Sequence, residues 1–360
     1  MSNKDVYENL KQSLKSDEKD FLDDILREKR LDEERAIIEG INHDVDHLAA
    51  VNFCCNFFIP TFHISKETGY TIVLIEPLYK MGIKSFDLAI FRKDNGSLIL
   101  IECKAAISQI SKEVDEVTKA IKEVINNKSI LEQTIGNKIT LIEFVLCVPH
   151  LAAQEVCNEI YEKAAPIITW GFSKLEGTMQ LIFKNDLESE MKQGRVHLDS
   201  NLRQLLLKGV KSEIGAIYTY PILPSSNRYT TLIYIIQCLF IMWRGLEQNR
   251  GKLGYVNIFG ILSQALTNKT AMDDSEIHDL TDSLINLGKR KEVFEDQTPQ
   301  INEVDKKIFR LTVNIRSAYM CEEQVRNKYV KKNALEKAYN ESVLRFQEKR
   351  GLKTLQSFLS

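Results

Sequence analysis

The chain has 360 residues, 44% hydrophobic and 27% charged, which is typical of a globular protein with room for two domains. Its formal net charge of −2 excludes a uniformly basic nucleic-acid-binding surface, so any such surface must be local. The seven cysteines form no CxxC pair, and Cys54 and Cys55 lie in an apolar run, which favours a reducing cytosol over a disulfide framework. The longest apolar run, Thr231 to Trp243, is shorter than the about 20 residues of a membrane span, and no signal peptide is recognisable. We therefore expect a cytoplasmic protein with no membrane partner.

The first 60 residues are predicted to be helical. Residues 1–31 mix charges of both signs and should form an N-terminal helical segment with a solvated face. A second helix is expected over 32–58, because apolar residues recur there at three- and four-residue spacing. Its core face consists of Ile38, Ile41, Val45 and Leu48. Pro60 ends it.

Residues 70–185 are predicted to alternate between strands and helices. A β-type run at 70–78 is followed by a hairpin over 86–105, whose turn contains Asn95-Gly96. A helix with Ser111 as its N-cap, a buried strand at 139–148, a helix at 150–163 and strands at 167–170 and 179–183 complete the series. The fold class is therefore α/β, with a mixed sheet flanked by helices over 32–185.

Three charged residues interrupt the apolar strands of this hairpin. Burying Asp87, Glu102 and Lys104 is costly unless they pair with each other or hold a metal. Side chains alternate along a strand, so Glu102 and Lys104 share a face about 7 Å apart, and Asp87 can reach them across the hairpin. The two carboxylates, with the backbone carbonyl of Cys103, predict a site for a hard cation such as Mg²⁺. Lys104 would orient a water molecule or offset negative charge at phosphorus, as phosphodiester hydrolysis requires.

Asp87 followed by Glu102-Cys103-Lys104 on the next strand resembles the PD-(D/E)xK nuclease superfamily. The resemblance covers about residues 32–185 and implies a restriction-endonuclease-like fold with Asp87 and Glu102 as metal ligands and Lys104 as the catalytic lysine. It also implies a Mg²⁺-dependent DNA endonuclease, in which Mn²⁺ can substitute, working in restriction or anti-phage defence. One departure is Phe86, which stands where the family name has proline.

Other residues are candidates for supporting roles. Members of this superfamily often add a glutamate from the preceding helix, and Glu39 is the expected extra ligand, with Glu34 as its rival. His43 lies four residues from Glu39 on the polar side of the same helix and is a candidate supporting residue; with His47 it has a spacing that also fits zinc. Gln109, at the mouth of the next helix, could steady the site or cap that helix.

The C-terminal half is predicted to be mainly helical. A linker over 186–225 leads to a segment at 226–314 that resembles a winged helix, with helices at 228–245, 255–267 and 274–287 and a hairpin from 288–294 and 308–313. The would-be recognition helix carries Asp274, Glu276, Asp279 and Asp282 and should repel phosphates. Candidate DNA-backbone contacts are Lys289, Arg290 and Lys291 in the wing, and the helix at 315–360, with ten Lys and Arg against five Glu.

Several alternatives remain open on the sequence. The C-terminal half could instead dock a protein partner or form a homodimer, which would supply two active sites for double-strand cleavage. The metal site could be vestigial in a DNA- or protein-binding scaffold. RNA is an alternative substrate.

Overall fold

The computed structural model describes residues 2–60, 62–83, 86–175, 178–183, 196–212, 221–243, 252–266, 270, 272–297, 307–312 and 317–350. Parts of the predicted linker (186–195 and 213–220) and of the terminal helix (315–316 and 351–360) lie outside these residues. The chain forms two compact units. The sheet unit comprises Asp44–Ser226 with Gly260–Asp279, and the helical unit comprises Met1–His43, Asn227–Phe259 and Leu280–Ser360. These units cut across the predicted segments 32–185 and 226–314.

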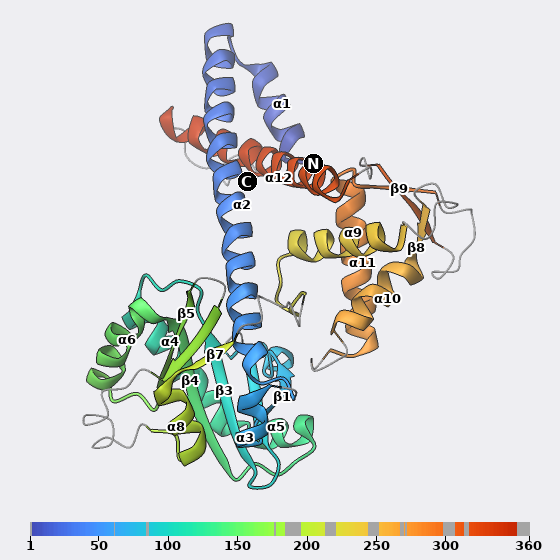
Figure 1. Ribbon diagram of the computed structural model, residues 1–360. Helices are drawn as coiled ribbons and strands as arrows, with labels where there is room; N and C mark the ends of the chain where they lie inside the picture. Colours follow the sequence, from blue (N-terminus) through green and yellow to red (C-terminus); the bar gives the residue numbers. More distant parts are fainter. Residues whose placement is uncertain are drawn as a thin grey trace. The chain divides into compact units, whose positions relative to one another are not determined.

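In the sheet unit, the described strands form one mixed seven-stranded sheet in the order β1-β2-β3-β4-β5-β6-β7 (Figure 1). Strands β3, β4 and β5 are parallel, and every other neighbouring pair is antiparallel. The strands are β1 (Thr71–Ile75), β2 (Leu88–Arg92), β3 (Ser97–Cys103), β4 (Leu141–Pro149), β5 (Ile168–Leu175), β6 (Thr178–Phe183) and β7 (Val210–Ser212). The predicted α/β class, with a mixed sheet between helices, is confirmed. The strand β7 lies where the sequence predicted a linker.

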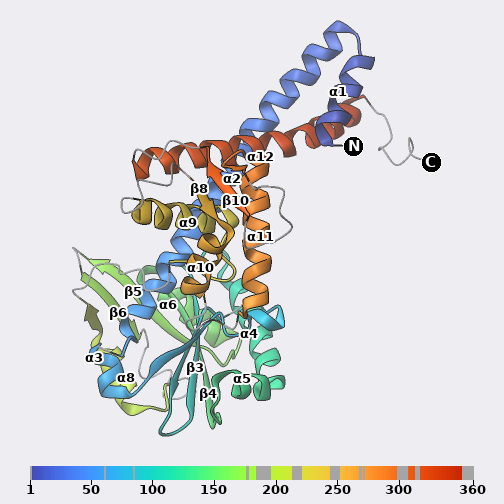
Figure 2. The same cartoon turned by 90° about the vertical axis from the view of Figure 1, so that its right-hand side faces the viewer.

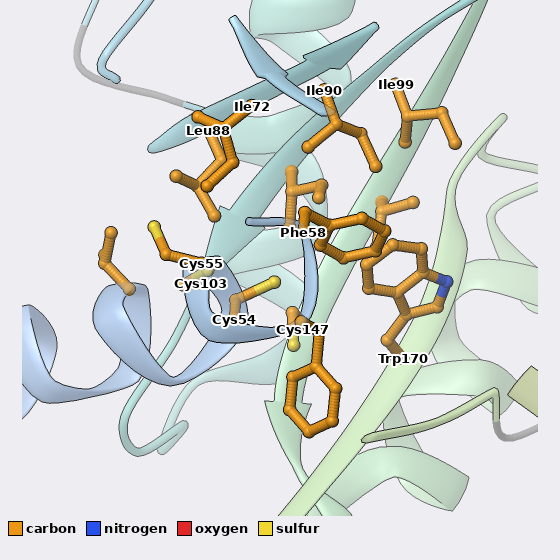
Figure 3. Close-up of a cluster of buried hydrophobic side chains, with 14 of the residues drawn as sticks. Cys54, Cys55, Phe58, Ile72, Leu88, Ile90, Ile99, Cys103, Cys147 and Trp170 are labelled. Atoms are coloured by element: carbon orange, nitrogen blue, oxygen red, sulfur yellow. The ribbon is translucent and has the colours of Figure 1, made fainter. Parts of the chain in front are cut away.

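Helices cover both faces of this sheet. The described helices of the sheet unit outside 260–279 are the end of α2 (Ser16–Phe57), α3 (His63–Thr68), η1 (Tyr79–Met81), α4 (Ile110–Asn126), α5 (Lys128–Ile135), α6 (His150–Glu162) and α8 (Ser200–Lys208). The end of α2, with α3 and α8, buries one face, and Figure 3 shows Cys54, Phe58 and Trp170 of this core. Helices α4, α5 and α6 bury the other. Cys54 and Cys55 are fully buried, as predicted.

The N-terminal helices differ from the prediction in one respect. Helix α1 (Asn3–Ser13) ends early, and α2 is then continuous, where the sequence placed a boundary between residues 31 and 32. No glycine or proline occurs between Ser16 and Gly40, and Arg30 pairs with Glu34 at 2.9 Å one turn later. Such i, i+4 pairs stabilise a helix surface, so nothing interrupts the helix at residue 31.

In the C-terminal half the structure is mainly helical, as predicted. The elements are α9 (Arg228–Trp243), β8 (Lys252–Gly254), α10 (Tyr255–Leu266), α11 (Asp274–Arg290), β9 (Phe294–Asp296), β10 (Ile308–Leu311) and α12 (Ala318–Lys349). The described strands form a small antiparallel sheet in the order β8-β10-β9. The predicted first hairpin strand is shorter than expected, because residues 288–290 continue α11. None of the helices in the described part of the chain is long and apolar enough to cross a membrane.

Within the helical unit, α12 packs against α1 and the first part of α2 (Figure 2). Their shared core consists of Tyr7, Leu22, Ile25, Val343 and Phe346. Around it, Lys337 pairs with Glu33 at 3.2 Å and Arg345 pairs with Glu28 at 3.0 Å. These two basic residues of the predicted basic helix are therefore matched by acidic residues of α2.

A buried polar cluster fixes the segment before α8 to the sheet. His197 is fully buried; its Nε2 accepts a hydrogen bond from the Trp170 indole N–H at 2.8 Å, and its Nδ1 lies 3.1 Å from Glu143 Oε2. Because Nε2 accepts a hydrogen bond, the ring proton is on Nδ1, and the Nδ1–H donates a hydrogen bond to Glu143. The Leu198 backbone N–H donates to the other Glu143 oxygen at 2.9 Å.

Candidate active site

The candidate site lies where β2 begins and β3 ends. Leu88 pairs with Ile101, and extending this register by one residue places Asp87 opposite Glu102. Both acids are buried: Asp87 is 3% exposed and Glu102 is 4% exposed. The Asn-Gly turn, which ends with Gly96 at φ 69°, produces the predicted hairpin and so brings together two acids fifteen positions apart in the chain.

Backbone N–H groups orient both carboxylates. The Cys103 N–H donates to Asp87 Oδ2 at 2.7 Å, and the Phe86 N–H donates to Glu102 Oε2. Phe86 has a φ of 71°, in the left-handed region that non-glycine residues rarely adopt. Proline could neither adopt this φ nor supply the N–H. Proline, which stands at this position in the name of the superfamily that the sequence resembles, is therefore incompatible with the geometry of this site.

Lys104 follows β3, and its ammonium lies between two carboxylates. Its Nζ is 3.0 Å from Glu102 Oε1 and 2.9 Å from Glu113 Oε2, on the first turn of α4. Burial lowers the pKa of Lys104, but the charges of Glu102 and Glu113 outweigh this effect, and the pKa is raised. Lys104 is thus charged at neutral pH, and it lies on the same face as Glu102, as strand alternation predicted.

His47 from α2 is the helix residue that contacts Asp87. Its Nε2 lies 3.0 Å from Asp87 Oδ1. Burial lowers the pKa of His47, but the charge and hydrogen bond of Asp87 outweigh burial and raise it to about 9. In the sequence His47 was considered only as part of a zinc-like pair with His43. Its contact with Asp87 depends on the packing of α2 against the sheet, which helical spacing alone does not define.

Glu76 is a third buried acid beside the site, and the sequence analysis did not select it. It follows β1, and its N–H donates to the Asp87 carbonyl at 2.8 Å. Burial raises the pKa of Glu76 to about 7, and the nearby charge of Asp87 adds to the shift. Its carboxylate accepts hydrogen bonds from the Ser225 N–H at 2.8 Å and from the Ser225 hydroxyl. The signal for Glu76 in the sequence was a single acidic residue directly after the apolar run of β1.

The donor chemistry of the site suits a hard divalent cation. Burial raises the pKa of Glu102, and the charge of Asp87 raises it further, so the two carboxylates would gain from a shared positive charge. Among the described residues, no group of three or more His, Cys, Asp or Glu side chains is arranged to hold a metal ion. The carboxylate oxygens are instead bonded to His47, Lys104 and backbone N–H groups, so a metal would share or replace those partners.

Other predicted site residues lie away from this cluster or play a different part in it. Glu39 and His43 are exposed on α2, and Glu39 precedes His47 by about 12 Å along the helix axis at roughly 1.5 Å per residue. Gln109 is exposed and is the N-cap of α4, which begins before the predicted cap Ser111. Cys103 contacts Asp87 through its N–H, whereas the sequence predicted a role for its carbonyl.

Of the basic run predicted to grip DNA, the two lysines pair with acidic residues of the protein itself, whereas Arg290 is exposed. Lys289 and Arg290 form the last turn of α11, and Lys289 pairs with Asp296. Lys291 is 2% exposed and pairs with Glu336 of α12 at 2.8 Å. The prediction that Lys291 contacts a DNA backbone is therefore wrong for this fold, because its ammonium is buried and already paired.

Comparison with known proteins finds one distant relative. A protein of Archaeoglobus fulgidus, named only as uncharacterized, is 24% identical over 347 residues, which cover 88% of this chain and 91% of the relative. No family model matches the chain, and no solved structure matches it.

Proposed function

We propose that this chain is a metal-dependent nuclease that hydrolyses phosphodiester bonds in DNA. The observation that carries the proposal is the meeting of buried Asp87 and Glu102 across the β2–β3 hairpin, with the Lys104 ammonium 3.0 Å from Glu102. The resemblance of these three residues to the PD-(D/E)xK superfamily supports the same assignment. A restriction-endonuclease-like fold for the sheet unit is part of this proposal.

The roles of the residues follow from their chemistry. Asp87 and Glu102 would hold Mg²⁺ through their carboxylate oxygens, and His47 lies beside Asp87 as its hydrogen-bond partner. The bound ion would polarise a phosphoryl oxygen and lower the pKa of a bound water. Lys104 stabilises negative charge as it builds on the phosphate, because its ammonium stays protonated next to two carboxylates.

The C-terminal half adds less support to a DNA substrate. Its order of helices, strands and hairpin is compatible with the winged-helix resemblance. Helix α11, however, begins with Asp274 and Glu276, and Lys291 is buried against Glu336. The proposal therefore rests on the sheet unit.

The test is cleavage of supercoiled plasmid, linear duplex, single-stranded DNA and RNA by the purified chain with Mg²⁺, Mn²⁺ or EDTA. We expect DNA cleavage with either metal and none with EDTA. Asp87→Asn and Lys104→Met should each lower the rate at least about 100-fold, since Asp87 would hold the metal and Lys104 would stabilise charge on the reacting phosphate. Glu116→Gln, an exposed residue of α4, is the matched control and should cleave at the wild-type rate.

The outcomes separate the alternatives. Cleavage that persists undiminished in both variants, or in EDTA, would contradict the assignment of the site. Cleavage confined to RNA would change the substrate and keep the chemistry. No cleavage of any substrate would favour a binding module with a vestigial site.

A further inference from the structure

Glu113 makes a contact with the candidate catalytic lysine that the three-residue motif does not include. Its Oε2 lies 2.9 Å from Lys104 Nζ, which also lies 3.0 Å from Glu102 Oε1. The side chains of Lys104 and Glu113 are 24% and 25% exposed, so water screens this pair only partly. The ammonium is therefore shared between an acid of the site and an acid outside it.

Helix α4 holds Glu113 in place. The helix buries Val114, Val117, Ile121 and Val124 against the sheet, which fixes its rotation and position. Glu113 lies in the first turn of this helix, where the macrodipole favours a negative charge. The backbone of Lys104 is held by its N–H, which donates to the Cys147 carbonyl at 2.9 Å, but its side chain is a flexible four-carbon stem that needs partners at its end.

We propose that Glu113 is the positioning residue for Lys104. It holds the ammonium at one point in front of Glu102, and it prevents Lys104 from pairing with Glu102 alone. Without Glu113, the Lys104 ammonium would lose one of its two carboxylate partners and would no longer be held at this point. The inference rests on the proposed function, because it takes Lys104 as the group that acts on the phosphate.

The charge and the reach of Glu113 can be changed separately. Glu113→Ala removes the anchor, Glu113→Gln keeps its shape without the charge, and Glu113→Asp keeps the charge on a side chain one carbon shorter. Glu116→Ala is the matched control, because Glu116 lies one turn further along α4 and pairs only weakly, with Lys112 at 3.8 Å. Each variant is compared with wild type for kcat, KM and Mg²⁺ binding by calorimetry.

We expect Glu113→Ala to lower kcat about 10- to 100-fold, because a misplacement of about 1 Å at a reacting centre can cost that much. KM and the Mg²⁺ dissociation constant should stay within threefold of wild type, since Glu113 contacts neither substrate nor metal. Glu113→Asp should recover more activity than Glu113→Gln. Full activity in Glu113→Ala would overturn the proposal, and so would a loss of Mg²⁺ binding, which would make Glu113 a ligand.

A second measurement does not depend on nuclease activity. An amine-reactive acylating reagent followed by mass spectrometry reports how freely the Lys104 amine is released from its partners. Glu113→Gln should label Lys104 at least fivefold faster than wild type or Glu116→Ala. Equal labelling rates would overturn the positioning role, whereas faster labelling in a chain that cleaves nothing would uphold it and reject only the proposed function.

Discussion

Phe86 donates its backbone N–H to the Glu102 carboxylate from a left-handed conformation with a φ of 71°. The strained residue is also buried, at 1% exposed, beside Phe144 at 5.6 Å between ring centroids. Its conformation and its side chain are thus both fixed by the structure around Glu102, which is the usual condition for strain to persist.

The first prediction concerns this strained position. Phe86→Pro should destabilise the protein by at least about 3 kcal/mol, because proline cannot adopt the φ and leaves a buried carboxylate oxygen without its donor. Phe86→Leu keeps the N–H and much of the volume and should cost about 1–2 kcal/mol. Urea unfolding measures both. Equal losses in the two variants would contradict a role for the N–H.

The second prediction is the titration of His47 in the presence of EDTA. Its pKa should be about 9, as read from ring proton shifts by NMR. The folded pKa exceeds the ordinary histidine value of 6.5, so the pair with Asp87 stabilises the protein fully below pH 6.5 and loses this contribution as the pH rises through about 9.

Asp87→Asn is the matched change for this titration. Removing the charge of Asp87 leaves burial as the main influence on His47, so the pKa should fall to 6.5 or lower and the alkaline loss of stability should disappear. A wild-type His47 that titrates near 6.5 would contradict the contact.

The third prediction concerns Lys291. Lys291→Glu should destabilise the protein by roughly 3–5 kcal/mol, because it places a buried carboxylate against Glu336. Lys331→Glu, at an exposed position on α12, should change the unfolding free energy by less than about 0.5 kcal/mol. Guanidinium unfolding compares them. If the Lys291→Glu protein is as stable as wild type and binds DNA more weakly, Lys291 contacts DNA and the prediction is contradicted.

The fourth prediction concerns the buried histidine. His197→Ala should cost about 2–4 kcal/mol, since it leaves the Trp170 N–H and one Glu143 oxygen without partners and opens a cavity. Leu198→Ala, at a residue 69% exposed, serves as the control and should unfold like wild type. Identical unfolding midpoints for both variants would mean that the cluster contributes no net stability.

Local pattern was enough to predict the centre of the candidate site. The Asn95-Gly96 turn and the strand alternation around it place Glu102 and Lys104 on one face, and both follow from neighbours in sequence. Along α4, apolar residues recur at helical spacing, and Val114, Val117, Ile121 and Val124 are buried, but Ile125 at the edge of the same stripe is 58% exposed. Local periodicity defines a helical face only to within about one residue at its edges.

The remaining site residues depend on contacts between distant segments. His47 reaches Asp87 because α2 packs on the sheet, and Ser225 reaches Glu76 from far along the chain. Glu39 had the expected residue type on the expected helix but lies further from the end that packs on the sheet. The burial of Lys291 likewise depends on α12, and no pattern within residues 288–294 encodes it.

The contact between α1 and α12 has a consequence for synthesis on the ribosome. Tyr7 is 1% exposed, and its ring lies 5.0 Å from that of Tyr339, so its burial requires a helix translated more than three hundred residues later. Domains generally fold in the order in which they emerge. Here the segment 44–226 emerges in one continuous piece, while α1 must wait for α12. The apolar face of α1 is therefore open to chaperones until α12 has emerged.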